Sequence, residues 1–187
     1  MNPDHSGAAG ACSEPDAVAA SLDLPVDLET PAGRVRLRRA TPADLDELMR
    51  LLADDPISAA RGDAAAEADR AAYLRALEAI SRDPANELVV AVSEEGVLVG
   101  TMQLTRIPGM ARQGATRLLI EAVRVGSPVR SAGIGTAMMR WAMGPAAESL
   151  GASLVQLTSD AARTDARRFY ERLGFVASHV GFKYRVP

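Results

Sequence analysis

Apolar and charged residues alternate from Val35 to Ala40, the pattern of a β-strand with one buried face. The next segment, Thr41 to Asp44, has the features of a helix start: a hydroxyl at the N-cap, a proline at the first helical position and an acid in the first turn. Leucines then recur at helical spacing until the break at Asp54-Asp55-Pro56. A second periodic segment predicts a helix from about Ala64 to Arg82.

The middle of the chain has the pattern of a β-meander. Two β-rich segments, Glu87–Val92 and Val97–Ile107, flank the turn Glu94-Glu95-Gly96 and predict a hairpin. A polar loop from Met110 to Thr116 follows. Another apolar segment, Arg117–Val125, predicts the next strand.

The last third of the chain predicts two helices, each followed by a strand. One helix follows Gly133, with a kink or break at Pro145 because proline lacks a backbone N–H; its apolar face comprises Ile134, Ala137, Met138, Trp141 and Ala142. A strand over Ser153–Thr158 then leads to a short amphipathic helix. Gly174 suits the left-handed position after that helix, where the next residue packs back on it.

The end of the chain, Val176 to Val186, predicts one or two closing strands. The predicted order is β, α, α, β, β, β, loop, α, β, α, β. This order indicates an α/β fold of the α+β kind, with a mixed, mostly antiparallel sheet and helices on both faces.

The first 33 residues show no sustained period, so residues 1–33 are predicted to be a mobile, disordered tail and residues 34–187 the domain. The segment lacks the basic start and apolar core of a signal peptide. One alternative stays open, in which residues Val18 to Leu28 pack on the domain or on a partner.

Composition excludes several classes of protein. The net charge of −3 argues against a dedicated nucleic-acid binder, and no apolar stretch approaches the length of a membrane span. The single cysteine, Cys12, forbids an intramolecular disulfide and is consistent with a cytoplasmic location. Two histidines and one cysteine offer no metal-site spacing, so we expect no metal.

Candidate chemistry gathers where the strand ending at Val125 meets the helix after Gly133. Arg130, Gly133 and Gly135 immediately precede or open this helix, whose first N–H groups and macrodipole attract anions, so the segment predicts a phosphate site. The dinucleotide fingerprint would require a glycine where Met138 stands. An ATP loop would require a lysine before a hydroxyl residue, and none is present. The plain alternative is a glycine-rich turn.

Two segments together resemble a known family. Arg130-x-x-Gly133-x-Gly135 resembles the acyl-CoA pyrophosphate loop of the GNAT superfamily of N-acetyltransferases. The segment Asp165 to Phe175, which contains Ala166, Tyr170-Glu171 and Gly174-Phe175, looks like the Ala-x-x-x-Tyr-Glu-x-x-Gly-Phe motif of the same family. The element order matches the GNAT fold from about residue 34 to the C-terminus.

The resemblance implies a binding site for acetyl-CoA as acyl donor. Main-chain groups at Val123 and Val125 would hydrogen-bond the pantetheine arm, and Arg130 would order the loop or contact phosphate. The backbone N–H groups for the pyrophosphate would come from Ser131, Ala132, Gly133, Ile134, Gly135 and Thr136. Phe169 would line the groove or its supporting core. Many members carry an asparagine where this chain has Arg163, which either contacts a CoA phosphate or ribose or lies in solvent.

Two residues are candidates for proton transfer. Glu121 precedes the cofactor-binding part of its strand and could accept the amine's proton, directly or through water; the alternative is an ion pair with Arg117 or Arg124. Strict alternation would place Glu121 on the face of Val123 and opposite Arg124. Tyr170 matches the family tyrosine near the thioester sulfur and would act as the acid. Its alternative role is packing in the core.

The resemblance implies an N-acetyltransferase that moves an acetyl group from acetyl-CoA to a primary amine of a small molecule by direct attack. Acetylation of a protein N-terminus or lysine, and a non-catalytic acyl-CoA-binding sensor, stay open as alternatives. The expected partner is a small-molecule amine, with no nucleic acid and no membrane. Because members of the family are often dimers, a homodimer is one expectation.

Overall fold

The computed structural model describes residues 21–60, 62 and 64–186 of the chain. Its strands are β1 (Val26–Thr30), β2 (Gly33–Arg39), β3 (Asn86–Ser93), β4 (Leu98–Ile107), β5 (Arg117–Val125) and β6 (Leu154–Leu157). Its α-helices are α1 (Leu45–Ala53), α2 (Pro56–Ala59), α3 (Arg70–Arg82), α4 (Ala111–Gly114), α5 (Ile134–Trp141), α6 (Ala147–Ser149) and α7 (Thr164–Arg172). Shorter helical turns are η1 (Pro42–Asp44), η2 (Glu67–Asp69), η3 (Ser127–Val129) and the π-helical turn η4 (Ala142–Ala146).

The described strands form one six-stranded sheet in the order β1-β2-β3-β4-β5-β6. The first four pairings are antiparallel, and only β5 and β6 run parallel. The parallel pair is connected by the crossover through α5, η4 and α6 that such a pair requires. The prediction of a mixed, mostly antiparallel sheet is confirmed.

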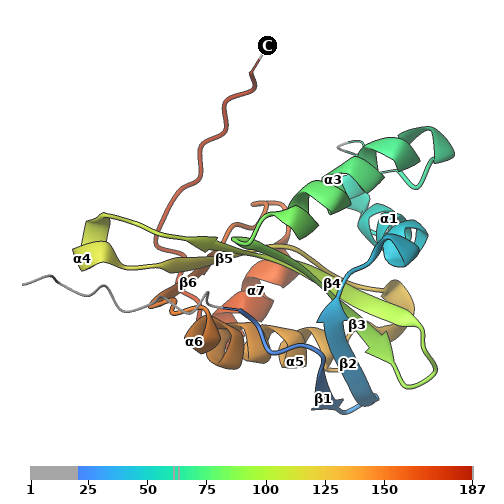
Figure 1. The fold of residues 1–187 in the computed structure, drawn as a ribbon, viewed down its shortest axis with the longest axis horizontal. Coiled ribbons are helices and arrows are strands. Elements are labelled where there is room, and N and C mark those ends of the chain that lie inside the picture. Colours follow the sequence, from blue (N-terminus) through green and yellow to red (C-terminus); the bar gives the residue numbers. More distant parts are fainter. Residues whose placement is uncertain (1–20, 61, 63, 187) are drawn as a thin grey trace, which may run out of the picture.

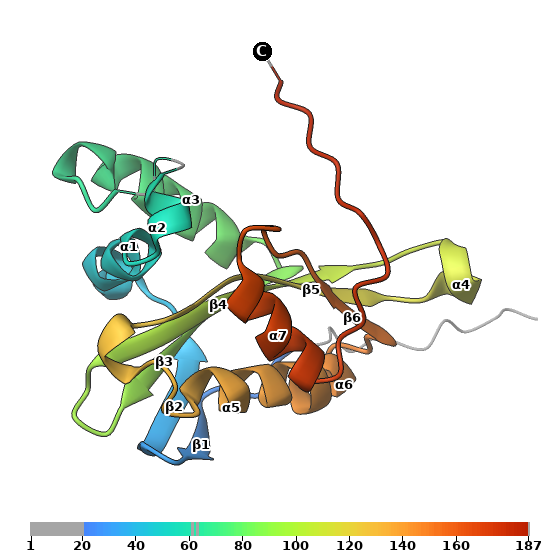
Figure 2. The same cartoon turned by 180° about the vertical axis from the view of Figure 1, so that it is seen from behind.

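Helices cover both faces of this sheet, as predicted (Figures 1 and 2). On one face α1 and α3 pack through Leu45, Met49 and Leu77, and through a neighbouring cluster around Val90. On the other face α5, η4, α6 and α7 cover the larger cluster. Each face of the sheet therefore has its own apolar layer, which the alternating strands supply.

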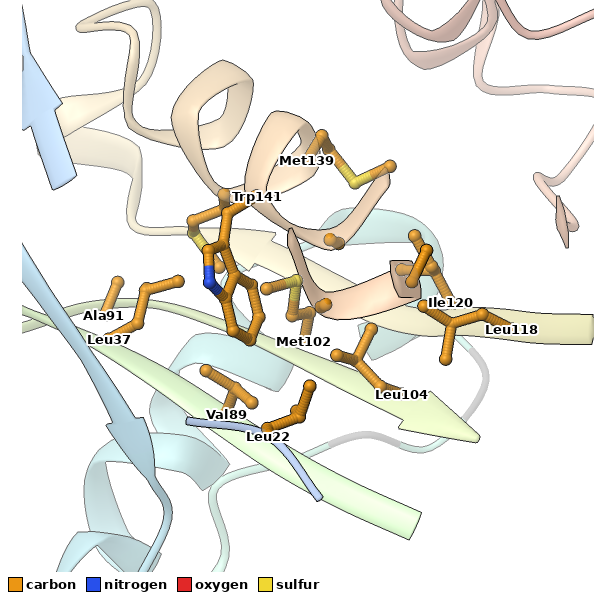
Figure 3. Packing of buried hydrophobic residues seen from close by; sticks show 14 of the residues in the cluster. Leu22, Leu37, Val89, Ala91, Met102, Leu104, Leu118, Ile120, Met139 and Trp141 are labelled. Carbon is orange, nitrogen blue, oxygen red and sulfur yellow. The ribbon is translucent and has the colours of Figure 1, made fainter. Parts of the chain in front are cut away.

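Trp141 lies at the centre of the larger cluster. Its ring points from α5 to the sheet, among Leu37, Val89 and Met102 (Figure 3). Those three strand residues are fully buried, and Trp141 is 6% exposed. Helix α5 therefore sits firmly on the sheet, and its N-terminus is held at a defined place beside β5.

The boundary predicted at residue 33 is wrong for its last part. Residues 1–20 lie outside the described part of the chain, but Val26–Thr30 forms β1, which pairs antiparallel with β2. Leu22 is 4% exposed and reaches the larger cluster, where Figure 3 shows it below Trp141. Burial of a leucine stabilises a fold by about 1.5–3 kcal/mol, so this segment belongs to the domain.

The prediction of closing strands at the C-terminus is also wrong. Residues Val176 to Val186 have no regular secondary structure and run away from the body of the protein (Figures 1 and 2). Phe182 is 94% exposed and Tyr184 85%. The alternating pattern is that of a strand, but a strand also needs a partner, and the described part of the chain offers this segment none.

The irregularity predicted at Pro145 takes the form of a π-helical turn. Pro145 lies inside η4, between α5 and α6, and the chain stays helical through it. The wider turn accommodates a residue that cannot donate a backbone hydrogen bond. The helix therefore does not break, and Ala146 and Ala147 remain buried.

Candidate functional site

A β-bulge in β5 decides which side chains face the candidate site. Thr101 pairs with Arg124 and Gln103 pairs with Glu121, so two steps along β4 match three steps along β5. The extra residue is Ala122, whose φ of 50° is in the left-handed region. Strained conformations of this kind in non-glycine residues cluster at functional sites.

The bulge overturns the face predicted for Glu121. Thr101 and Gln103 lie on one face of β4, so their partners Arg124 and Glu121 lie together on that face, the one covered by α1 and α3. Val123, like Val125, packs against the larger cluster on the other face. Strict alternation fails here because the inserted residue shifts the side-chain period by one. The side chain of Glu121 is exposed.

Strands β5 and β6 separate just before the bulge. Their parallel pairing ends at Ile120 and Leu157, while β5 continues to Val125. The edge of β5 at Val123 and Val125 thus has no strand partner on the β6 side among the described residues. The carbonyl oxygen of Val123 accepts from Arg124 Nη1 at 2.9 Å, and that of Val125 accepts from Arg130 Nε at 3.1 Å.

The loop between β5 and α5 presents the start of a helix to this gap. Ser131 and Gly133 have φ values of 65° and 85°, and Gly133 is the N-cap of α5. The next residues, Ile134, Gly135 and Thr136, form the first turn of α5, so their backbone N–H groups have no partner inside the helix. The arrangement of strand, glycine-rich loop and helix N-terminus matches the sequence prediction and can bind an anion.

Close packing requires a glycine at Gly133, whereas a methyl group at Gly135 would make only ordinary contacts. A Cβ on Gly133 would lie 2.5 Å from Cδ of Pro31, and one on Gly135 would lie 3.4 Å from Cγ2 of Val125 and 3.7 Å from Cζ of Phe169. Pro31 lies in the segment that the sequence assigned to the tail. The turn between β1 and β2 therefore packs over the loop and helps to shape it.

Arg130 orders the loop through Asp54. Its Nη2 donates to Oδ2 of Asp54 at 2.8 Å, and the same oxygen accepts from the backbone N–H of Ser127 at 2.8 Å. With its bond to Val125, Arg130 joins the end of β5 to the end of α1. Of the two roles expected for Arg130, these contacts correspond to ordering the loop.

Arg163 has a partner that neither expected role included. It is the N-cap residue of α7, and its guanidinium makes two hydrogen bonds to the carboxylate of Asp55. The side chains are 20% and 16% exposed, respectively. The pair joins the end of α1 to the start of α7. The sequence analysis assigned Asp54 and Asp55 only to a helix end. Two adjacent acidic residues in a chain with many arginines are also consistent with ion pairs.

Tyr170 is largely buried on α7 between two aromatic rings. Its ring lies 5.3 Å from that of Phe169 and 5.8 Å from that of Phe175, centroid to centroid. Gly174 has a φ of 96°, and the N–H of Phe175 donates to the carbonyl of Tyr170 at 3.0 Å, which confirms the predicted cap of the helix.

The environment of Tyr170 keeps its phenol protonated. Burial raises the pKa of Tyr170, and the positive charges of Arg124 and Arg163 lower it to a smaller extent. Arg124, which shares a strand face with Glu121, lies close enough to Tyr170 for its charge to act on the phenol.

An apolar cavity of about 210 Å³ lies on the α1 and α3 side of the bulge. Ala122 lines it from β5, and Thr101 and Gln103 line it from β4. The other lining residues, from α1, α3 and β3, are Leu45, Leu48, Met49, Leu52, Tyr73, Ala76, Leu77, Ile80 and Leu88.

Two further polar residues, Asp160 and His179, have local partners. Asp160 Oδ1 accepts from the N–H of Ala162 at 2.8 Å, so Asp160 caps a turn after β6. His179 is exposed and contacts Ser178. Within residues 21–60, 62 and 64–186 no three His, Cys, Asp or Glu residues are grouped as metal ligands would be. In the same residues no helix combines the length and apolarity needed to cross a membrane.

Comparisons with known proteins agree with this geometry. The sequence profile of the acetyltransferase (GNAT) family matches residues 45–175. The crystal structure of a transcriptional regulator from Bacillus halodurans C-125 is 41% identical, with a TM-score of 0.76, and the match covers 81% of this chain and 99% of that one. An acetyltransferase from Trypanosoma brucei is 25% identical, with a TM-score of 0.63 and the same two coverages. No curated protein sequence matches significantly.

The chain therefore belongs to the GNAT family of acetyltransferases. The family match runs from α1 to the cap of α7, and it includes strands β3 to β6, the loop before α5, the bulge and Tyr170. The class of enzyme that this defines is an acyltransferase.

Proposed function

We propose that this protein transfers an acetyl group from acetyl-CoA to the primary amine of a small molecule. The observation that carries the proposal is that β5 separates from β6 just before the bulge at Ala122, while the loop after β5 leads to the N-terminus of α5. A thioester with a long amide arm and a pyrophosphate matches such an arrangement in both shape and charge.

The residues present fit acetyl-CoA. The first turn of α5, with Gly133 and Gly135, would hold the pyrophosphate, because the backbone N–H groups there have no partner inside the helix. The free edge of β5 at Val123 and Val125 would bind the amide arm through main-chain groups. Arg130 supports the loop through Asp54, and Phe169 supports Gly135 from α7.

The acyl donor supplies an activated carbonyl, and the protein supplies the proton transfers. An alkyl ammonium of pKa ~10 must lose a proton before its nitrogen can attack. Glu121, exposed beside the end of the gap, accepts this proton through water. The neutral nitrogen then bonds to the carbonyl carbon and gives up its second proton to solvent. The carbon–sulfur bond breaks, and the sulfur leaves as a thiolate.

Tyr170 protonates the departing thiolate. A thiol has a pKa of ~8.5, which is below the pKa of a phenol. Proton transfer from Tyr170 therefore depends on the negative charge that develops on the sulfur beside the phenol. Burial raises the pKa of Tyr170, so the proton to be donated is present at neutral pH. Solvent then returns a proton to the tyrosine.

Calorimetric titration with acetyl-CoA, followed by thiol release against a panel of primary amines, tests the proposal. We expect binding and turnover on at least one amine. Binding without turnover on amines or peptides would support a sensor instead, and turnover on peptides alone would support a protein acetyltransferase. Absence of acetyl-CoA binding would overturn the proposal.

The variant Glu121→Gln tests the base. We expect kcat to fall by about 10²- to 10⁴-fold, because the neutral amide cannot accept a proton. The dissociation constant of acetyl-CoA should not change, because this side chain lies on the face of β5 that α1 and α3 cover, away from Val123 and Val125. Full activity of this variant would exclude Glu121 as the base.

A further inference from the structure

The apolar cavity beside the bulge is placed where the acceptor's own side group would lie. Glu121 is the cross-strand partner of Gln103 and the chain neighbour of Ala122, and both of these residues line the cavity. Directly opposed residues of an antiparallel pair have Cβ atoms about 4.5–5.5 Å apart. The carboxylate of Glu121 therefore lies close to the cavity, on the same face of the sheet.

The surface of the cavity is almost wholly apolar. Its lining contains no charged residue among those that the structure describes. The hydroxyl of Thr101 already donates to the carbonyl of Val89 at 3.0 Å, and Nε2 of Gln103 donates to Asn86 at 2.9 Å. A polar group placed here would lose its bonds to water without replacement, which disfavours it strongly.

The size of the cavity limits the group that fits. An apolar cavity of about 150 Å³ holds a benzene molecule. At about 210 Å³, this cavity has room for a phenyl ring or a branched alkyl group of similar size, but not for a sugar ring system or a folded peptide.

We propose that the acceptor is a primary amine with a compact apolar group on a short stem, the apolar group seated in this cavity and the ammonium beside Glu121. The inference rests on the proposed acetyl transfer and adds the chemical class of the acceptor. An apolar wall next to a carboxylate complements such a molecule at both ends. Polyamines and aminoglycosides carry several charged or hydroxyl groups, which the apolar lining of the cavity does not match.

An amine series tests the proposal. Ethylamine, 3-methylbutylamine, 2-phenylethylamine and the diamine putrescine share the reacting group and differ in what enters the cavity. We expect kcat/KM, measured by thiol release, to rise by about 10- to 100-fold from ethylamine to the two apolar amines, because each buried methylene adds binding energy. Putrescine should be no better than ethylamine.

A matched pair of variants tests the location. Ala76 and Ala79 are both exposed on α3, but only Ala76 lines the cavity. Ala76→Phe should reduce the ratio of kcat/KM for 2-phenylethylamine to kcat/KM for ethylamine by at least 10-fold. Ala79→Phe, the same substitution at a neighbouring site, should leave this ratio unchanged.

Calorimetric binding of the amines shows whether this inference fails independently of the transferase proposal. Calorimetry with 2-phenylethylamine and with ethylamine, with and without CoA, reports occupancy of the cavity whether or not acetyl is transferred. Tighter binding of 2-phenylethylamine that is lost in Ala76→Phe and kept in Ala79→Phe supports the proposal. Equal binding of the two amines, or equal effects of the two variants, overturns it. Missing acetyl-CoA binding would instead overturn the transferase proposal.

Discussion

The substitution Gly133→Ala tests how the loop between β5 and α5 is packed. Gly133 has a φ of 85° and is the N-cap of α5, and a Cβ at this position would lie 2.5 Å from Cδ of Pro31 and 3.0 Å from its Cγ. Contacts this short do not occur between real carbon atoms. The substitution therefore adds two separate penalties, one in the backbone of the loop and one in its contact with the turn between β1 and β2.

Each penalty has a known magnitude. A left-handed conformation costs an alanine roughly 1–2 kcal/mol more than a glycine. Forcing a methyl group into filled space costs about 1–3 kcal/mol. We therefore expect Gly133→Ala to lower the free energy of unfolding by about 2–5 kcal/mol. For a chain of this size, each kcal/mol shifts the melting temperature by about 2–4 °C.

Gly174→Ala is the matched control. Gly174 has a similar φ of 96°, but a Cβ there would meet nothing within 4 Å. This variant should lose only the roughly 1–2 kcal/mol of the backbone penalty. Urea unfolding of both variants gives the difference directly, provided that the dependence on urea concentration is unchanged.

A double variant isolates the contact with Pro31. Combining Pro31→Ala with Gly133→Ala removes the atoms that the new methyl group would meet, so about 1–3 kcal/mol should return. If Gly133→Ala costs no more than Gly174→Ala, or if the double variant recovers nothing, then Pro31 does not pack on the loop and the reasoning is refuted.

Tyr170→Phe should lower kcat by about 10²-fold or more and leave acetyl-CoA affinity unchanged, and an unchanged kcat in rapid-quench assays would exclude the acid role. Because the charge of Arg163 lowers the pKa of Tyr170, Arg163→Gln should move the alkaline limb of the kcat/KM profile to higher pH; a shift to lower pH would contradict this. Asp44 accepts two hydrogen bonds from Arg38, both at 2.7 Å, so Asp44→Asn should cost about 1.5–3 kcal/mol at pH 7 in urea unfolding. Arg38 lowers the pKa of Asp44 below its ordinary 3.8, so this contribution is complete above pH 3.8 and is lost as the pH falls through the lowered pKa; a cost that is the same at pH 2 and pH 7 would contradict it.

Local features of the chain were predictable from sequence because neighbouring residues produce them. The hairpin of β3 and β4 follows from alternation and a turn, and the start of α5 follows from glycines before a helical period. The cap at Gly174 and Phe175 was predictable for the same reason, because its hydrogen bonds join residues near the end of α7. Thr41 was likewise predicted as the N-cap of a helix that starts at Pro42, and the structure places it there.

The errors in the prediction all concern contacts between distant parts of the chain. Residues 22–29 do alternate between apolar and other residues, but so short a segment becomes a strand only where a partner pairs with it. The edge of β2 and the cluster around Trp141 give it that place. The C-terminal segment has a clear strand pattern but no partner strand. Asp55 and Arg163 are 108 residues apart, and no spacing rule joins them.

The sequence by itself determined the class of fold and the glycine-rich loop at the start of α5, because these rest on patterns within a few turns of chain. Its resemblance to the GNAT family proposed Glu121 and Tyr170 for proton transfer. Only the tertiary structure decided how they face one another. The bulge at Ala122 places Glu121 on the face of Arg124, beside the apolar cavity. An alanine carries no local signal for a left-handed φ, so this conformation is imposed by the packing of β4, β5 and the helices on both sides.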